Sequence, residues 1–98
     1  MTYSELLDLL GPEIKKRRLN SCSAHEVTFE NGVALVSYST MVAAKINNKY
    51  YFTAKHDCSY PTNYNVITWC SISAPERRAM IKSGEAISVT STWGSFPY

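Results

Sequence analysis

Residues 31–48 read NGVALVSYSTMVAAKINN, an apolar run that lies between two turn signals. Asn-Gly favours a two-residue type I′ hairpin turn, because both central residues of that turn adopt positive φ. We interpret Asn47-Asn48 as a second two-residue turn of the same kind. The run and its flanks therefore predict a three-stranded antiparallel meander over residues 25–54. Its central strand would be long, and we expect a bend or bulge at Ser39-Thr40.

The two turns also predict which residues lie opposite each other. The first pairs Glu30 with Val33, and the second pairs Ile46 with Lys49. Successive side chains of a strand point to opposite faces, so this register divides the apolar residues between two faces. One face is expected to carry Val27, Phe29, Ala34, Val36, Tyr38, Val42, Ala44, Ile46 and Tyr51. The other is expected to carry Val33, Leu35, Met41, Ala43, Tyr50 and Phe52.

Helix signals flank the meander on both sides. Thr2-Tyr3-Ser4-Glu5 matches a capping box, and Gly11-Pro12 interrupts the helical pattern that follows it. The basic residues 15–18 are then expected at a helix C-terminal end, where cations complement the carbonyl dipoles. A second capping box, Ser73-Ala74-Pro75-Glu76, predicts a helix over residues 74–83.

Two further strands are predicted after the meander, separated from it by a polar loop over residues 55–65. Residues 66–72 are rich in β-branched and aromatic side chains, and residues 86–92 alternate as an edge strand does. The order of elements predicts one α+β domain over residues 1–98. It has an antiparallel sheet of four to five strands, an N-terminal helix and a second short helix.

Composition describes a globular protein of low charge. Hydrophobic residues make up 45% of the 98 residues and charged residues 18%, and the net charge is +2. So small a charge ranks nucleic acid below protein and small-ligand partners. The three cysteines, Cys22, Cys58 and Cys70, form an odd set without a close pair, so we expect reduced thiols and a cytoplasmic location. Residues 6–10 are too short for a signal peptide, and no segment is long enough to span a membrane.

Candidate chemistry is sparse. His56-Asp57-Cys58 brings together three catalytic residue types, but neighbours on an extended segment point apart. A zinc site would draw on Cys22, Cys58, Cys70, His25 and His56, which lack the close pairs of a structural zinc centre. We therefore predict no catalytic residues, no metal and no cofactor.

Binding residues are expected in the polar loop and at the start of the second helix. Tyr60 and Tyr64 would serve recognition from the loop, the alternative being burial beneath it. Arg77 and Arg78 would hold an anion near free helical N–H groups, the alternative being a surface helix with Glu76–Arg pairing. The candidate binding set is Tyr60, Tyr64, Lys55, His56, Arg77 and Arg78.

The second apolar face of the sheet needs a cover. Two short helical segments can cover one face well, so the other requires the C-terminal segment or a second chain, which would make the protein a homo-oligomer. The candidate interface residues are Val33, Leu35, Met41, Tyr50 and Phe52.

Three segments together resemble a pattern of small uncharacterised tailed-phage proteins. They are Tyr38-Ser39-Thr40-Met41-Val42-Ala43, Tyr50-Tyr51-Phe52-Thr53 and Ser59-Tyr60-Pro61-Thr62. The Thr-Thr of that pattern is Pro61-Thr62 here, and its late basic or histidine position falls at Tyr64. The resemblance implies a viral accessory origin and supplies no functional residues.

These observations predict a non-catalytic viral accessory protein that neutralises a host factor by stoichiometric binding in the host cytoplasm. The target would be a host protein, in particular a defence protein, or a small nucleotide signal that an oligomer sequesters. One alternative is a small nucleic-acid-binding module that uses residues 15–18, Arg77, Arg78 and the loop tyrosines. The other is a small enzyme centred on Cys58 and His56.

Overall fold

The computed structural model describes residues 1–19 and 24–90, and within them it contains three helices and a six-stranded sheet. The helices are α1 (Tyr3–Leu10), α2 (Tyr60–Cys70) and α3 (Ala74–Ser83). The strands are β1 (Glu13–Arg18), β2 (Ala24–Phe29), β3 (Val33–Ser37), β4 (Thr40–Ile46), β5 (Lys49–Thr53) and β6 (Ala86–Val89).

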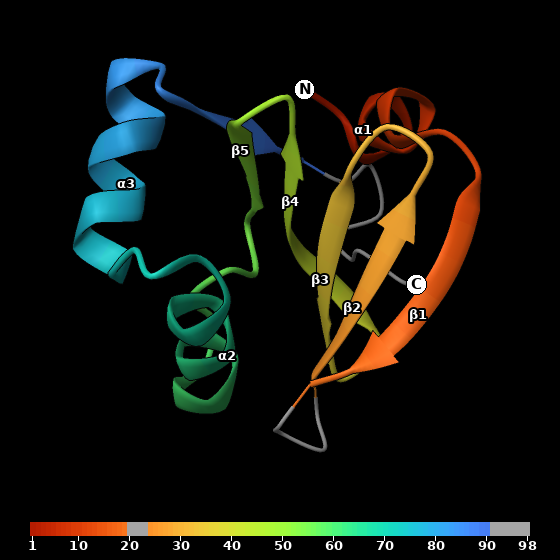
Figure 1. Cartoon of the computed structure of the whole chain (residues 1–98). Coiled ribbons are helices and arrows are strands. Elements are labelled where there is room, and N and C mark those ends of the chain that lie inside the picture. Colours follow the sequence, from red (N-terminus) through yellow and green to blue (C-terminus); the bar gives the residue numbers. More distant parts are fainter. Residues whose placement is uncertain (20–23, 91–98) are drawn as a thin grey trace.

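The six strands lie side by side in chain order (Figure 1). Strands β1 to β5 are antiparallel neighbours, and β6 pairs with β5 in parallel. The predicted α+β class is confirmed, with more strands than the four to five expected. No helix of the described residues is both long and apolar enough to cross a bilayer.

Helix α1 begins at the predicted capping box and ends at the predicted glycine. The Thr2 side chain accepts a hydrogen bond from the Glu5 N–H, and the Glu5 carboxylate accepts one from the Thr2 N–H. Gly11 ends the helix with φ 78°. The expectation that residues 15–18 form a helix end was wrong, because Pro12 cannot continue the helix and its carbonyl instead accepts from the Glu30 N–H. Residues 15–18 therefore belong to the exposed edge strand β1.

The first hairpin turns one residue earlier than predicted. The Phe29 N–H donates to the Gly32 carbonyl at 2.8 Å, so the turn residues are Glu30 and Asn31. Gly32 does not adopt positive φ; a Cβ atom there would lie 2.6 Å from the Lys45 carbonyl, so glycine is needed for close approach of β4. The β2–β3 register is displaced by two residues, which keeps every side chain on its predicted face.

The long central strand is divided into β3 and β4 by a further hairpin. Tyr38 and Ser39 adopt φ of 59° and 99°, so the bend expected at Ser39-Thr40 is a complete reversal. A bulge then places both Val42 and Ala43 opposite Leu35. This extra residue moves Met41 and Val42 to the faces opposite to those predicted.

The second predicted turn is confirmed. Asn47 and Asn48 adopt φ of 52° and 66°, as a type I′ turn requires. Ile46 pairs with Lys49, and the pairs further along β4 and β5 follow the predicted register.

The predicted strand over residues 66–72 was wrong, and the loop predicted over 55–65 extends only to residue 59, because residues 60–70 form α2. Ser59 caps the helix by accepting from the Thr62 N–H, and a proline lies in the first turn. The inward stripe of α2 has helical spacing but mixes polar with apolar side chains: Thr62, Asn65, Val66 and Trp69. These capping and packing contacts override the β propensity of the segment.

Helix α3 follows the sequence-based expectation, and β6 forms where a strand was predicted but pairs with β5 in parallel, not antiparallel. Ser73 caps α3, and Gly84 ends it with φ 88°. Strand β6 ends at Val89, and the predicted continuation to residues 91–92 lies outside the described residues.

Two cores lie on opposite faces of the sheet, and helices of the same chain cover both. Helix α1 covers one core, whose buried members are Leu6, Leu10, Val27, Phe29, Ala34, Val36, Met41, Ala44, Ile46 and Val89. Helices α2 and α3 cover the other, whose buried members are Ala24, Leu35, Val42, Ala43, Phe52, Val66 and Ala86. Both faces are apolar as predicted. The expected interface residues Leu35, Met41 and Phe52 are fully buried in these cores, and Val33 and Tyr50 are half-buried.

Candidate ligand-binding site

Arg77, from the predicted binding set, is buried at the centre of a polar network. Its Nε donates to Nδ1 of His56 at 3.0 Å, and its Nη1 donates to the Ile72 carbonyl at 2.6 Å. Its Nη2 donates to Oδ1 of Asn63 and to the His56 carbonyl. The guanidinium thus ties α3 to α2 and to the segment that follows β5. Its donors are used within the protein, so Arg77 serves structure here and not ligand binding.

His56 is held in the same network. It is 6% exposed, and its ring lies 5.5 Å from the Phe52 ring. Burial lowers the pKa of His56; Asp57 opposes this shift, and Arg77 and Arg78 add to it. The Nδ1 atom accepts from Arg77, which requires the neutral ring. The hydrogen bond from Arg77 thus occupies Nδ1 of His56, which leaves that atom unable to act as a base for Cys58, an exposed residue.

Stability is expected to fall as the pH drops below about 6.5, the ordinary pKa of histidine. Because the folded pKa of His56 is lowered, the unfolded chain binds a proton that the folded chain resists. The contribution of neutral His56 is present above that pH and is lost as the pH falls through the folded pKa. Urea unfolding midpoints between pH 8 and pH 5 measure this loss, and the His56→Gln variant should show a weaker pH dependence. Identical profiles for the two proteins would contradict it.

A second buried polar cluster joins α2 to the end of β3. The hydroxyl groups of Ser37 and Thr62 lie 3.2 Å apart, and Nδ2 of Asn65 donates to the Ser37 hydroxyl at 3.2 Å. These bonds set the position of α2 over the sheet. They matter for the site because Asn65 also lines the pocket described next.

A pocket of about 400 Å³ lies between the end of β1, the start of β2 and α2. We call it the β1–α2 pocket, and its lining residues are Arg17, Arg18, Leu19, Ala24, Tyr64, Asn65, Thr68 and Trp69. Its volume is within the range of small-ligand sites. The lining combines cationic, aromatic and neutral polar groups, which is suited to a ligand that carries negative charge and a planar ring.

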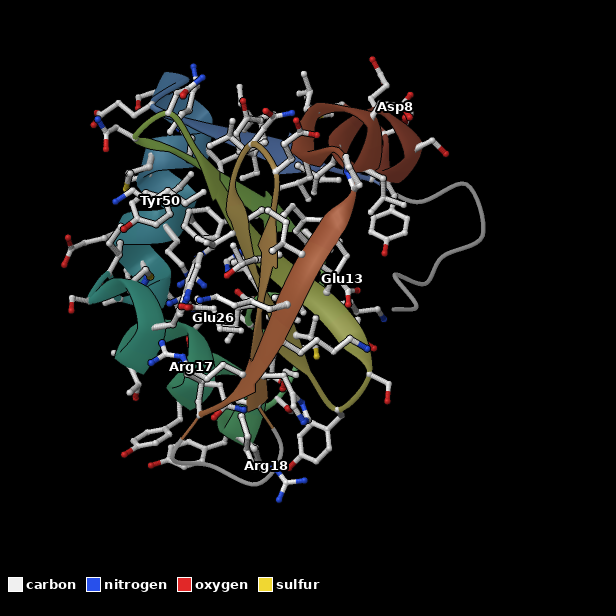
Figure 2. All side chains as sticks on the ribbon, turned by 45° about the vertical axis from the view of Figure 1, so that its right-hand side comes forward. Asp8, Glu13, Arg17, Arg18, Glu26 and Tyr50 are labelled. Atoms are coloured by element: carbon white, nitrogen blue, oxygen red, sulfur yellow. The ribbon has the colours of Figure 1, made fainter. Side chains whose placement is uncertain are left out.

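Glu26 connects the cationic side of the pocket to its aromatic side. One carboxylate oxygen accepts from Nη2 of Arg17 at 3.1 Å, and the other accepts from Nε1 of Trp69 at 2.8 Å. The Arg17 side chain remains 67% exposed, so most of its guanidinium faces solvent. Figure 2 shows Arg17 and Glu26 on the same side of β1, with Arg18 at the end of that strand. Glu26 thus positions two groups that a ligand would meet.

The predicted binding residues separate into four places. Tyr60 and Tyr64 are 81% and 57% exposed on α2, and Tyr64 lines the pocket. Arg78 pairs with Asp57 at 2.8 Å on the surface. Lys55 is half-buried after β5, and His56 and Arg77 belong to the buried network.

The sequence did not reveal that the end of the basic run, Arg17 and Arg18, lines one pocket together with Trp69. The predictions placed residues 15–18 at a helix end and Trp69 on a strand. The signal that could have found the site is the stripe Tyr64, Asn65, Thr68 and Trp69. These are two adjacent pairs four residues apart, which places all four on one side of a helix.

The described residues contain no cluster of three or more His, Cys, Asp or Glu side chains that could hold a metal ion. Cys58 and Cys70 are free thiols, and Cys22 lies outside the described residues. Burial raises the pKa of the Cys70 thiol, which donates to the Ile72 carbonyl. This thiol therefore favours its protonated form.

Comparison with protein-family models, curated proteins and solved structures found no match to the chain. The case for a function therefore rests on the geometry of the β1–α2 pocket.

Proposed function

We propose that the chain is a non-catalytic binding protein that sequesters a nucleotide-type ligand in the β1–α2 pocket. The observation that carries this proposal is the meeting of Arg17 and Arg18 with Tyr64 and Trp69 around one small pocket. Guanidinium groups bind phosphate through paired, charge-assisted hydrogen bonds. Aromatic side chains stack on bases, and neutral polar groups such as Asn65 orient a bound ligand.

A small ligand fits the burial pattern better than a large protein partner does. The residues from which we expected a protein interface are mostly inside the cores, with Phe52 and Leu35 fully buried. The pocket, in contrast, opens beside exposed Arg17, Arg18 and Tyr64. These features favour capture of a nucleotide over the masking of a host protein.

A binding role also fits the state of His56 better than catalysis does. A Cys–His enzyme needs a histidine that can take a proton from its cysteine. His56 instead accepts from Arg77 and is almost fully buried. This engagement favours sequestration over the small Cys/His enzyme considered from the sequence.

In the biological setting that the phage resemblance suggests, sequestration would be stoichiometric. Each chain would remove one nucleotide signal from the cytoplasm of the host cell and so blunt a defence response. Abundance of the protein, and not turnover, would then limit the effect.

Arg17→Gln is expected to weaken nucleotide binding by roughly tenfold to a hundredfold. A hydrogen bond to a charged group contributes about 1.5–3 kcal/mol, which converts to this range of affinity. Isothermal titration with a panel of nucleoside mono- and triphosphates measures the change. Arg78→Gln removes the same charge from a surface pair away from the pocket and is the matched control. Absence of binding at millimolar nucleotide, or equal effects of both variants, would contradict the proposal.

A further inference from the structure

A row of five side chains crosses the sheet beside the pocket. Successive members are direct cross-strand partners on neighbouring strands, from β1 to β5. We call it the sheet row, and its members are Lys15, Thr28, Val33, Lys45 and Tyr50. Direct partners point to the same side of a sheet, so all five lie on one face.

The face that carries the sheet row is the one on which α2 lies. The Tyr50 ring meets the Trp69 ring edge to face, with centroids 6.1 Å apart. Nζ of Lys45 lies 5.2 Å from the centroid of the Tyr50 ring. Lys15 is exposed, and the other four members are half-buried, so α2 and α3 leave this row in contact with solvent.

The sheet row is continuous with the β1–α2 pocket. Trp69 lines the pocket and also contacts Tyr50 of the row. Arg17 and Glu26 lie two residues along their strands from Lys15 and Thr28, on the same face. Figure 2 shows Arg17, Glu26 and Tyr50 together on the side of β1 that faces α2 and α3.

The charge on this combined surface is one-sided. Lys15 and Lys45 of the row add to Arg17 of the pocket, and neither the pocket lining nor the row contains an acidic residue. Glu26, between them, is already bonded to Arg17 and Trp69. The net charge of +2 for the whole chain therefore conceals a local cationic track.

We infer that the ligand is a short single-stranded oligonucleotide, which extends from the pocket past Trp69 and along the sheet row. The backbones at Lys15 and Lys45 are three strand spacings apart, about 14 Å. Nζ of Lys45 is directed over the Tyr50 ring on the strand beyond it, away from Lys15, so the two ammonium groups suit separate phosphates. A chain of phosphates would satisfy both lysines, and bases would stack on the aromatic side chains. This inference rests on the proposed function and names the class of its ligand.

The test compares a mononucleotide with a pentanucleotide, each as RNA and as DNA, by fluorescence anisotropy over a range of salt concentrations. The variant is Lys15→Gln with Lys45→Gln. The matched control is Lys16→Gln with Lys49→Gln, because these lysines pair with Val27 and Ile46 of the core under α1 and so lie on the opposite face. Both double variants lose the same charge.

The wild-type protein is expected to bind a pentanucleotide of at least one sugar type about tenfold more tightly than the mononucleotide. Loss of the two row lysines should reduce the slope of log affinity against log salt by about 1.4, since each phosphate contact on a single strand contributes about 0.7. The control should keep the wild-type slope, and mononucleotide affinity should stay within twofold in both variants.

Equal wild-type affinities for mononucleotide and pentanucleotide would overturn the extension and leave the proposed function standing. An equal change of slope in the two double variants would also overturn it, because the effect would then come from net charge alone. Failure of both ligands to bind would remove the proposed function together with the extension.

Discussion

Replacing Arg77 with methionine is expected to lower the free energy of unfolding by about 3–5 kcal/mol. The side chain is fully buried, and it donates to His56, Asn63 and the Ile72 carbonyl. Methionine fills similar space but leaves these buried acceptors without donors. A buried acceptor that loses its partner retains the cost of its desolvation.

Arg78→Met is the matched control, since it makes the same change one residue later in α3. Arg78 is exposed, and its ion pair with Asp57 should contribute less than about 1 kcal/mol. Urea unfolding followed by circular dichroism measures both variants. Arg77→Lys keeps the charge but not the fork of donors, so its stability should lie between that of the wild type and that of Arg77→Met. Equal losses for Arg77→Met and Arg78→Met would refute the structural role of Arg77.

Phe52→Ala is also expected to cost about 3–5 kcal/mol of unfolding free energy. Its ring is fully buried, lies parallel to the Tyr50 ring at 5.7 Å and contacts the His56 ring. Truncation would open a cavity under α2 and α3, at the joint between the apolar core and the polar network. Tyr60→Ala, on an exposed aromatic of α2, should change stability by no more than about 0.5 kcal/mol.

The concentration dependence of this loss tests whether Phe52 belongs to a core or to an interface. If Phe52 packs within one chain, unfolding midpoints of the wild type and of Phe52→Ala will not vary with protein concentration. A residue at a subunit interface would make the wild-type midpoint rise with concentration, because association stabilises the folded state by mass action. If the wild-type midpoint rose with concentration and that of Phe52→Ala did not, the result would support the subunit interface predicted from the sequence.

The elements predicted correctly are those whose signals are local. The capping boxes at Thr2 and Ser73 place α1 and α3, and Asn47-Asn48 places the β4–β5 turn with its register. Each signal consists of residues within a few positions that satisfy one another's backbone groups. Tertiary packing could not easily change them.

The errors arose where a local pattern allowed two structures. Residues 66–70 have strand propensity, but the Ser59 cap and the buried Val66 select a helix. Residues 15–18 are basic enough for a helix end, but β2 supplies backbone partners and makes them a strand. Tyr38-Ser39 carries no glycine, so a turn with positive φ at both residues left little trace in the sequence.

The sequence by itself determined the α+β class, the element boundaries that depend on the Thr2 and Ser73 caps and the Asn47-Asn48 turn, and, except for Met41 and Val42, the division of core side chains between two faces. Only the tertiary structure decided which residues meet at the candidate site. Trp69 and Glu26 are 43 positions apart, yet one hydrogen bond joins them beside the pocket. No local rule relates a helix to an edge strand at that distance. Their meeting depends on how the buried stripe of α2 packs on the sheet, because burial and polar pairing set that position together.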